Sequence, residues 1–244
     1  IFMVMGANVG TTVTAKIVSL GHITRKSEFR RAFAASSVHD TFNLVTVAIM
    51  LPLELKFKIL ETSARYLGSA FVDVTGVTKP ENYLKKATKP VIEWMGDVLN
   101  SDPWLLIVSV AITFFMLFAI VKLLQRLVLK KLESFFDAYL FRNAAIAFVV
   151  GMCLTVLVQS SSITTSLIVP LAGAGVIRLQ QVFPFTIGAN IGTTVTGLLA
   201  ALAAASAVDV APGEPIPPAI VAGATVAFAH LLFNCSGAII FLPY

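Results

Sequence analysis

Residues 159–162 read Gln-Ser-Ser-Ser, and residues 188–196 read Gly-Ala-Asn-Ile-Gly-Thr-Thr-Val-Thr. The residues around both motifs are apolar enough for a lipid bilayer, where a polar side chain is costly unless it faces a protected cavity and has partners. The nine-residue glycine motif also occurs at residues 6–14, with Val9 in place of Ile191 as the only difference. We therefore expect a functional site built from hydroxyl and amide side chains inside a membrane protein.

A second pattern follows each copy of the glycine motif. Residues 39–43 read His-Asp-Thr-Phe-Asn, and residues 230–234 read His-Leu-Leu-Phe-Asn. In both copies a proline lies nine residues after the final asparagine. Repeats of this length in a hydrophobic chain indicate the two halves of a transporter.

The composition indicates an integral membrane protein. The chain is 57% hydrophobic and only 13% charged, about half the charged share of a soluble domain, and its mean hydropathy is +0.87. The net charge of +5 comes from basic residues that flank apolar runs, which is typical of helix orientation in a membrane and not of nucleic-acid binding. Cys153 and Cys235 lie in apolar runs and imply neither a disulfide framework nor a metal site.

The repeats predict the domain organisation. We expect residues 1–55 to be the C-terminal part of a first repeat, residues 56–103 to be a solvent-exposed extracytoplasmic connector, and residues 104–244 to be a second repeat truncated near its end. A complete first repeat would carry its own Gln-Ser-Ser-Ser motif upstream of Gly6, where the sequence has no room for it. We therefore expect this sequence to be a fragment, truncated at both ends.

Four apolar runs are long enough to cross a membrane as helices: residues 32–53, 104–124, 183–205 and 219–242. The first of them should end at Pro52. Two shorter runs, residues 144–158 and 163–176, enclose the Gln-Ser-Ser-Ser motif, which predicts a re-entrant hairpin or a broken helix. The basic loop at residues 25–31 should lie on the cytoplasmic side.

The Gln-Ser-Ser-Ser motif can hold an ion without a formal charge of its own. Serine hydroxyls and free backbone N–H groups at a half-helix N-terminus suit a phosphate-like anion, which the positive end of the helix dipole also favours. Carbonyl and hydroxyl oxygens from the same break suit a sodium ion. The alternative is that the serines only allow helices to pack closely. A glutamine plus three serines between two short apolar arms favours the ion site.

The glycine motif also allows two interpretations. Its Gly-x-x-x-Gly spacing matches a common helix-packing pattern. Beyond packing, three polar side chains of each copy share one helical face. They are Asn190, Thr193 and Thr196, with the counterparts Asn8, Thr11 and Thr14. The motif is not a nucleotide-binding P-loop, because no lysine follows its glycines.

The two polar residues at the start of the histidine motif, His39 and Asp40, are predicted to have different roles. His39 recurs as His230, which favours a shared structural role in both repeats. Asp40 has Leu231 as its counterpart, and an isolated carboxylate inside a membrane is expensive. This difference in charge between the repeats suggests a cation-linked step at Asp40.

Together these motifs resemble a known family. The Gln-Ser-Ser-Ser motif, the repeated glycine motif, the Val-His-Asp-x-Phe-Asn segment at residues 38–43 and the Leu-Pro-Leu-Glu segment at residues 51–54 closely resemble the type II sodium-dependent phosphate cotransporters, in a bacterial form. The resemblance covers the chain except residues 56–103. It implies an all-α integral membrane fold of two inverted repeats, with re-entrant or broken helices that carry the substrate near the membrane centre. The chain departs from the family in lacking the first Gln-Ser-Ser-Ser motif and the connector cysteines of animal members.

The resemblance also implies which residues bind the ions. Phosphate contacts fall on Ser160, Ser161 and Ser162, and Asp40 falls where electrogenic members carry an aspartate and an electroneutral member has glycine. Sodium positions of the family match Gln159, Ser160, Thr193 and Thr196. With the repeat counterparts, the predicted sodium ligands are Gln159, Ser160, Asn190, Thr193, Thr196, Asn8, Thr11, Thr14 and Asp40. We expect no catalytic residue, no cofactor and no metal other than sodium.

The expected function is electrogenic, sodium-coupled secondary active symport of inorganic phosphate by a multi-pass protein of the bacterial inner (cytoplasmic) membrane. Its partners would be inorganic phosphate, sodium ions and the lipid bilayer. One alternative is a sodium symporter of another tetrahedral oxyanion, such as sulfate or arsenate. Two others are a membrane-embedded enzyme that uses His39 and Asp40 as an acid–base pair, and a non-transporting scaffold whose small residues only pack helices.

Overall fold

The computed structural model describes residues 1–76, 143–207 and 217–241, together with scattered helical residues between 90 and 119. The described residues are helical and include no strand, which confirms the all-α prediction. The long helices are α1 (Phe2–Leu20), α2 (Lys26–Phe57), α3 (Ile59–Gly76), α6 (Ala144–Val158), α7 (Ser161–Ala174), α8 (Leu179–Ala207) and α9 (Pro218–Phe241).

Three of these helices, α2, α8 and α9, are long and apolar enough to cross a membrane. They cover the predicted spans at residues 32–53, 183–205 and 219–242 almost completely. The fourth predicted span, residues 104–124, lies mostly outside the described residues. The length and composition of α2, α8 and α9 therefore support a membrane protein.

The end of α2 differs from the prediction that it stops at Pro52. Pro52 lies inside the helix, which continues to Phe57 and ends at Lys58 in a left-handed conformation with φ 51°. A proline removes one intrahelical hydrogen bond but does not by itself end a helix. Both carboxylate oxygens of the buried Glu54 then accept backbone N–H groups of the next helix, from Leu60 at 2.8 Å and Glu61 at 2.9 Å.

Helix α3 occupies the first part of the segment that we expected to be a connector. It packs along α9, and its residues Leu60, Ala64 and Val72 are buried. At Gly68 the backbone of α3 approaches Thr225 of α9 so closely that an added Cβ would lie 2.8 Å from the Thr225 hydroxyl. This part of the segment is therefore packed against the helices that follow the second glycine motif. Residues 77–103 lie almost entirely outside the described part of the chain.

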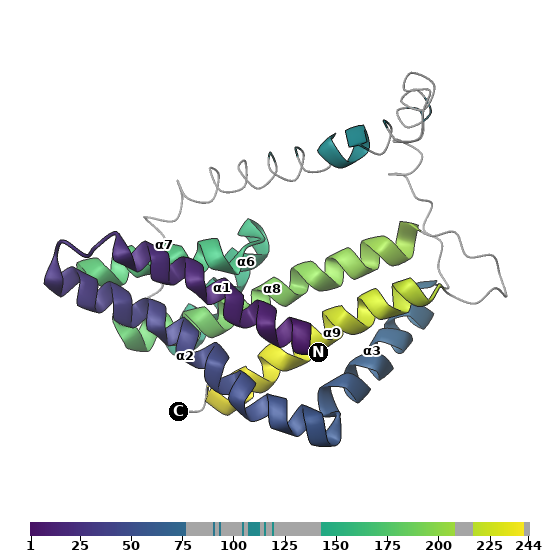
Figure 1. Ribbon diagram of the computed structural model, residues 1–244, viewed down its shortest axis with the longest axis horizontal. Helices are drawn as coiled ribbons and strands as arrows, with labels where there is room; N and C mark the ends of the chain where they lie inside the picture. Colours follow the sequence, from purple (N-terminus) through teal and green to yellow (C-terminus); the bar gives the residue numbers. More distant parts are fainter. Residues whose placement is uncertain are drawn as a thin grey trace.

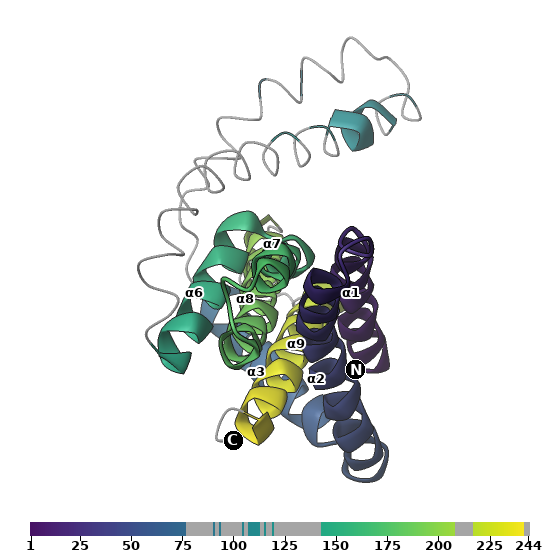
Figure 2. The same cartoon turned by 90° about the vertical axis from the view of Figure 1, so that its left-hand side faces the viewer.

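In the described part of the chain, α6, α7 and α8 form one group of helices and α1 and α2 form another. Figure 2 shows α6, α7 and α8 on one side, α1 and α2 on the other, and α9 between them. In Figure 1, α3 and α9 lie side by side at one end, and α7 lies beside α1 and α2 at the other. Helix α7 thus places the tip of the α6–α7 hairpin against the first copy of the glycine motif.

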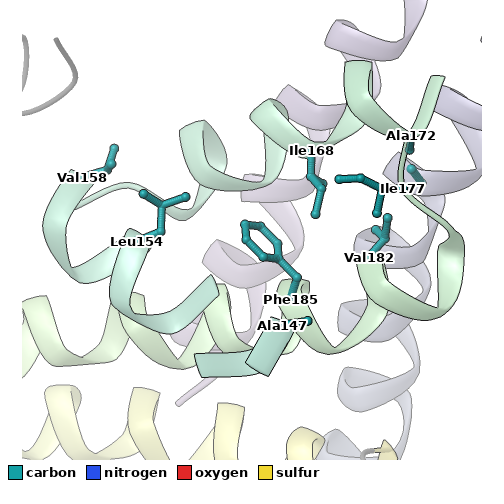
Figure 3. Packing of buried hydrophobic residues seen from close by; sticks show 9 residues of the cluster. Ala147, Leu154, Val158, Ile168, Ala172, Ile177, Val182 and Phe185 are labelled. Atoms are coloured by element: carbon teal, nitrogen blue, oxygen red, sulfur yellow. The ribbon is translucent and has the colours of Figure 1, made fainter. Parts of the chain in front are cut away.

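A buried apolar cluster holds α6, α7 and α8 together. Figure 3 shows the fully buried ring of Phe185 from α8 among Leu154 of α6, Ile168 of α7 and Val182. The backbones of α6 and α8 also approach closely, because Gly151 lies against Phe185. This packing fixes the position of both short helices beside the second glycine motif.

Candidate functional site

The α6–α7 hairpin breaks at the Gln-Ser-Ser-Ser motif, as the two short apolar runs predicted. Helix α6 ends at Val158, the exposed residue Gln159 follows it with φ 56°, and α7 begins after Ser160. The Ser160 hydroxyl accepts the N–H of Ile163 at 3.3 Å and so caps α7. The N-terminus of α7 therefore presents hydroxyl groups and backbone N–H groups at one point of the chain.

The tip of this hairpin contacts the first copy of the glycine motif. The hydroxyl of Ser162 donates to the backbone carbonyl of Thr11 in α1 at 3.3 Å. Ser161 is buried beside it, and its backbone carbonyl accepts the hydroxyl of Thr165 at 2.8 Å. Residues that are about 150 positions apart in the sequence thus meet at one place.

A chain of buried hydrogen bonds joins the two glycine motifs through α2. Asn190 of α8 accepts at Oδ1 from His39 Nε2, 3.0 Å away, when that nitrogen carries the proton, and its Nδ2 donates to Asn43 Oδ1 at 2.8 Å. Asn43 Nδ2 donates in turn to the backbone carbonyl of Asn8 at 2.8 Å. All four residues are at least 95% buried. Buried polar networks of this kind fix the relative position of helices. One atom of this network is unpaired, since the buried Nδ1 of His39 has no hydrogen-bond partner among the described residues.

The second histidine motif makes different contacts from the first, although its recurrence suggested the same role. Asn234 Nδ2 donates to the backbone carbonyl of His230 in its own helix at 3.2 Å. Asn234 Oδ1 is buried, and no partner for it lies among the described residues. Asn8 donates to Val4 of its own helix at 2.9 Å. Asn190 therefore bonds to another helix, whereas the side chains of Asn8 and Asn234 make no hydrogen bond to another helix in the described part of the chain.

Asp40 lies outside this network and has its own partners. Its Oδ1 accepts the hydroxyl of Thr12 at 2.9 Å, and its Oδ2 lies 3.2 Å from the ammonium of Lys16. Lys16 also donates to the hydroxyl of Ser37 at 3.0 Å, and its ammonium lies 4.5 Å from the ring centre of Phe33. His39 and Asp40 thus bond to different helices and different partners, and no hydrogen bond joins their two side chains in the described part of the chain.

Sequence reasoning missed Lys16, Thr12 and Ser37. Lys16 is the only lysine, arginine, aspartate or glutamate among the first 20 residues, four positions after Thr12 on the same helical face. That isolated charge in an apolar run was the available signal, because such a residue needs a partner.

The structure brings together only some of the residues predicted to bind sodium. The backbone carbonyl of Thr11 accepts the hydroxyl of Ser162, which is a predicted phosphate contact, and Asn8 and Asn190 belong to one network. The hydroxyl of Thr193 donates to the backbone carbonyl of Ala189 in its own helix at 3.2 Å. Within the described ranges, no hydrogen bond joins the side chains of Gln159, Thr14 or Thr196 to another predicted ligand. The ligand roles of all these residues stay predictions.

A cavity of about 490 Å³ lies away from this site. It opens where α2 begins and α7 ends, and its lining includes Arg30, Arg31 and Arg178 but none of the predicted ligands. The Arg31 guanidinium is already bonded to the carbonyl of Gly173 at 2.8 Å. The candidate site therefore rests on the contacts among α1, α2, α7 and α8 and not on this cavity.

Comparison with known proteins identifies the family of this chain. A family model described as Na+/Pi-cotransporter matches residues 105–241. Sodium-dependent phosphate transport protein 2B of Pongo abelii is 28% identical over 99% of this chain and 47% of its own length. Protein 2A of Ovis aries is 29% identical over 99% of this chain and 48% of its length, and protein 2B of Homo sapiens is 29% identical over 99% and 46%.

The chain thus spans about half the length of the curated relatives it matches. No solved structure matches it.

Proposed function

Because the chain belongs to the Na+/Pi-cotransporter family, we propose that it takes part in sodium-coupled secondary active symport of inorganic phosphate across the cytoplasmic membrane of a bacterium. The observation that carries this proposal is the break between α6 and α7, whose serines lie against the first glycine motif. The family relatives are named as transporters, which supports a protein that is not an enzyme.

The phosphate would bind at Ser160, Ser161 and Ser162. The N-terminus of α7 offers backbone N–H groups and the positive end of a helix dipole, both of which favour an anion. Its hydroxyl groups can donate to phosphate oxygens without bringing a fixed charge into the membrane. Such neutral donors hold an anion less tightly than an arginine ion pair would, so a transported phosphate can be released.

The sodium ions would bind at oxygen atoms around this tip. The first ligands are Gln159, Ser160, Thr193 and Thr196, with Asn190 and the first-copy residues Asn8, Thr11 and Thr14 beside them. Sodium would bind first and neutralise the cavity, which would then accept the phosphate. If one net positive charge enters per cycle, a potential of 100 mV contributes about 2.3 kcal/mol to uptake. If Asp40 makes transport electrogenic, a sodium ion must bind at its carboxylate.

The proposed fold is a pair of inverted repeats with a re-entrant hairpin. Helices α1 and α8 carry the two glycine motifs, and α2 and α9 carry the two histidine motifs, so that α1–α2 corresponds to α8–α9. The α6–α7 arms, of 15 and 14 residues, are too short to cross a membrane singly, which supports a hairpin that enters and leaves from one side.

Equilibrium binding tests this proposal without requiring transport. Calorimetric titration of the protein, expressed from its full gene and purified in detergent, should show phosphate binding in sodium chloride and much weaker binding in potassium chloride. Titration with sulfate and arsenate separates phosphate from other tetrahedral oxyanions. Phosphate binding of equal strength in both salts would contradict sodium coupling, and preferential binding of sulfate would replace the proposed substrate.

The Thr193 hydroxyl is a specific test of the sodium ligands. Thr193→Val should raise the sodium concentration needed for half-maximal phosphate binding, while phosphate affinity at saturating sodium changes little. The matched control is Thr225→Val in α9, whose hydroxyl also donates to the carbonyl four residues earlier in its own helix. An unchanged sodium requirement in Thr193→Val would remove Thr193 from the site.

A further inference from the structure

An ion pair joins Lys16 of α1 to Asp40 of α2. Asp40 is the carboxylate that the family resemblance predicts to bind sodium. Asp40 lies about 21 Å along α2 from Lys26, because a helix rises about 1.5 Å per residue. This distance is about two thirds of the hydrocarbon thickness of a bilayer. Asp40 and Lys16 retain 28% and 29% of their side-chain exposure, and they lie 3.2 Å apart.

Two side chains place oxygen atoms on the Lys16 ammonium, and a third holds the carboxylate of Asp40. Lys16 bonds to Asp40 Oδ2 and to the Ser37 hydroxyl, and the other carboxylate oxygen of Asp40 is held by Thr12. Ser37 and Asp40 are three positions apart and share one face of α2, which turns toward α1. A carboxylate with neighbouring hydroxyl groups is also a typical ligand set for a hard monovalent cation.

We propose that the Lys16 ammonium occupies the cation position beside Asp40 and there replaces a coupling sodium ion. The inference rests on the proposed sodium-coupled function, and it concerns how many sodium ions this chain uses. A covalently attached ammonium neutralises Asp40 in every state of the transport cycle. A sodium ion would neutralise it only in the loaded state.

The consequence is a change in charge movement. With Lys16 in place, the Asp40 region carries no net charge either when the transporter is loaded or when it returns empty. With sodium there instead, the empty protein would return with an uncompensated carboxylate, and each cycle would move one more positive charge inward. The chain should therefore move one sodium ion and one charge fewer per phosphate than a variant without the ammonium.

Sodium binding to purified protein tests the inference directly. We would measure equilibrium binding of radioactive sodium to the unsubstituted protein and to Lys16→Ser, which removes the ammonium and leaves a hydroxyl. Lys16→Ser should bind one more sodium ion per chain, and Lys16→Arg, which keeps the positive charge, should not. Gel filtration and circular dichroism confirm that each variant is folded. A folded Lys16→Ser protein with an unchanged number of sodium ions would overturn the inference.

Asp40→Asn gives a second test that keeps Lys16. In the unsubstituted background this change should leave the number of bound sodium ions unchanged, because the carboxylate binds the ammonium and not sodium. In the Lys16→Ser background it should remove the additional ion. Loss of one sodium ion from Asp40→Asn alone would show that sodium displaces Lys16, which would also overturn the inference.

Transport in sealed liposomes distinguishes this inference from the proposed function. Simultaneous measurement of current and labelled phosphate uptake should give one more charge per phosphate in Lys16→Ser than in the unsubstituted protein. If neither protein takes up phosphate with sodium, the proposed function fails, while the sodium-binding counts still decide the role of Lys16. If both take up phosphate with the same charge per phosphate, the proposed function stands and the inference fails.

Discussion

The two copies of the glycine motif differ at one position in sequence, yet they lie in different surroundings. In α8 an added Cβ at Gly188 would meet the backbone carbonyl of Phe148 in α6, and at Gly192 it would lie 2.6 Å from the carbonyl of Met152. In α1 an added Cβ at Gly6 or Gly10 would meet no atom within 4 Å. The same local sequence forms a helix in both places, but its neighbours decide whether a glycine is needed for close packing.

The asparagines of the two copies show the same difference. Asn190 bridges α8 to two residues of α2, whereas the Asn8 side chain bonds only within α1 among the described residues. Side chains of α2 therefore bond to the side chain of Asn190 in the second copy, but in the first copy Asn43 bonds to the backbone carbonyl of Asn8. A repeated motif thus predicts a repeated helix, but it does not predict repeated contacts.

The largest expected difference between the copies lies at the glycines. Gly188→Ala should lower the free energy of unfolding by about 3 kcal/mol, because a methyl group would push α8 away from α6. Gly6→Ala should be neutral or stabilising by up to about 1 kcal/mol, because alanine favours a helix and has open space there. Thermal unfolding midpoints in one detergent measure both. Equal destabilisation by the two changes would contradict the difference in surroundings.

A smaller difference is expected at the asparagines. Asn190→Ala should destabilise the protein by about 2 kcal/mol, because it leaves buried groups of His39 and Asn43 without their partner. Asn8→Ala should cost about 1 kcal/mol or less, since the backbone carbonyl that accepts from Asn43 remains. The same unfolding measurement compares them. If Asn8→Ala proved the more damaging change, the side chain of Asn8 would have to make contacts beyond its own helix.

The smallest effect is expected at the junction of α2 and α3. Glu54 lies two residues after Pro52, and its carboxylate accepts two backbone N–H groups of α3. Glu54→Gln should destabilise by about 1 kcal/mol, because one of two charged acceptors at the α3 N-terminus is lost. The control is Glu61→Gln, whose ion pair with Arg65 is partly exposed and contributes about 0.5 kcal/mol or less. An unfolding midpoint of Glu54→Gln that equals that of the unsubstituted protein would mean that Glu54 does not stabilise the α2–α3 junction.

Much of the helical fold could be predicted from apolar run length and from residues that break helices. The spans over α2, α8 and α9 and the break at Gln159 follow from these signals, which act within one segment of the chain. The packing of α3 against α9 could not be predicted, because it depends on a close approach at Gly68 between segments about 150 residues apart. Local composition also gave no reason for α2 to continue through Pro52.

The sequence predicted which residues form the candidate site, but it did not predict which of them contact each other. The serines and the glycine motifs were recognisable because polar groups in an apolar run need a function or a partner. Which partners they have depends on the tertiary packing. Asn190 bonds to His39, and Asp40 bonds to Lys16, across helices that the sequence alone does not orient.

Phosphate uptake into sealed liposomes tests the central claim most directly. The protein, expressed from its full gene, is reconstituted, and uptake of labelled phosphate is compared under an inward sodium gradient and an equal inward potassium gradient, with protein-free liposomes as the control. Accumulation of phosphate above its external concentration with sodium, and only equilibration or no uptake with potassium, is the result that sodium-coupled symport predicts. Equal uptake in the two gradients would contradict it.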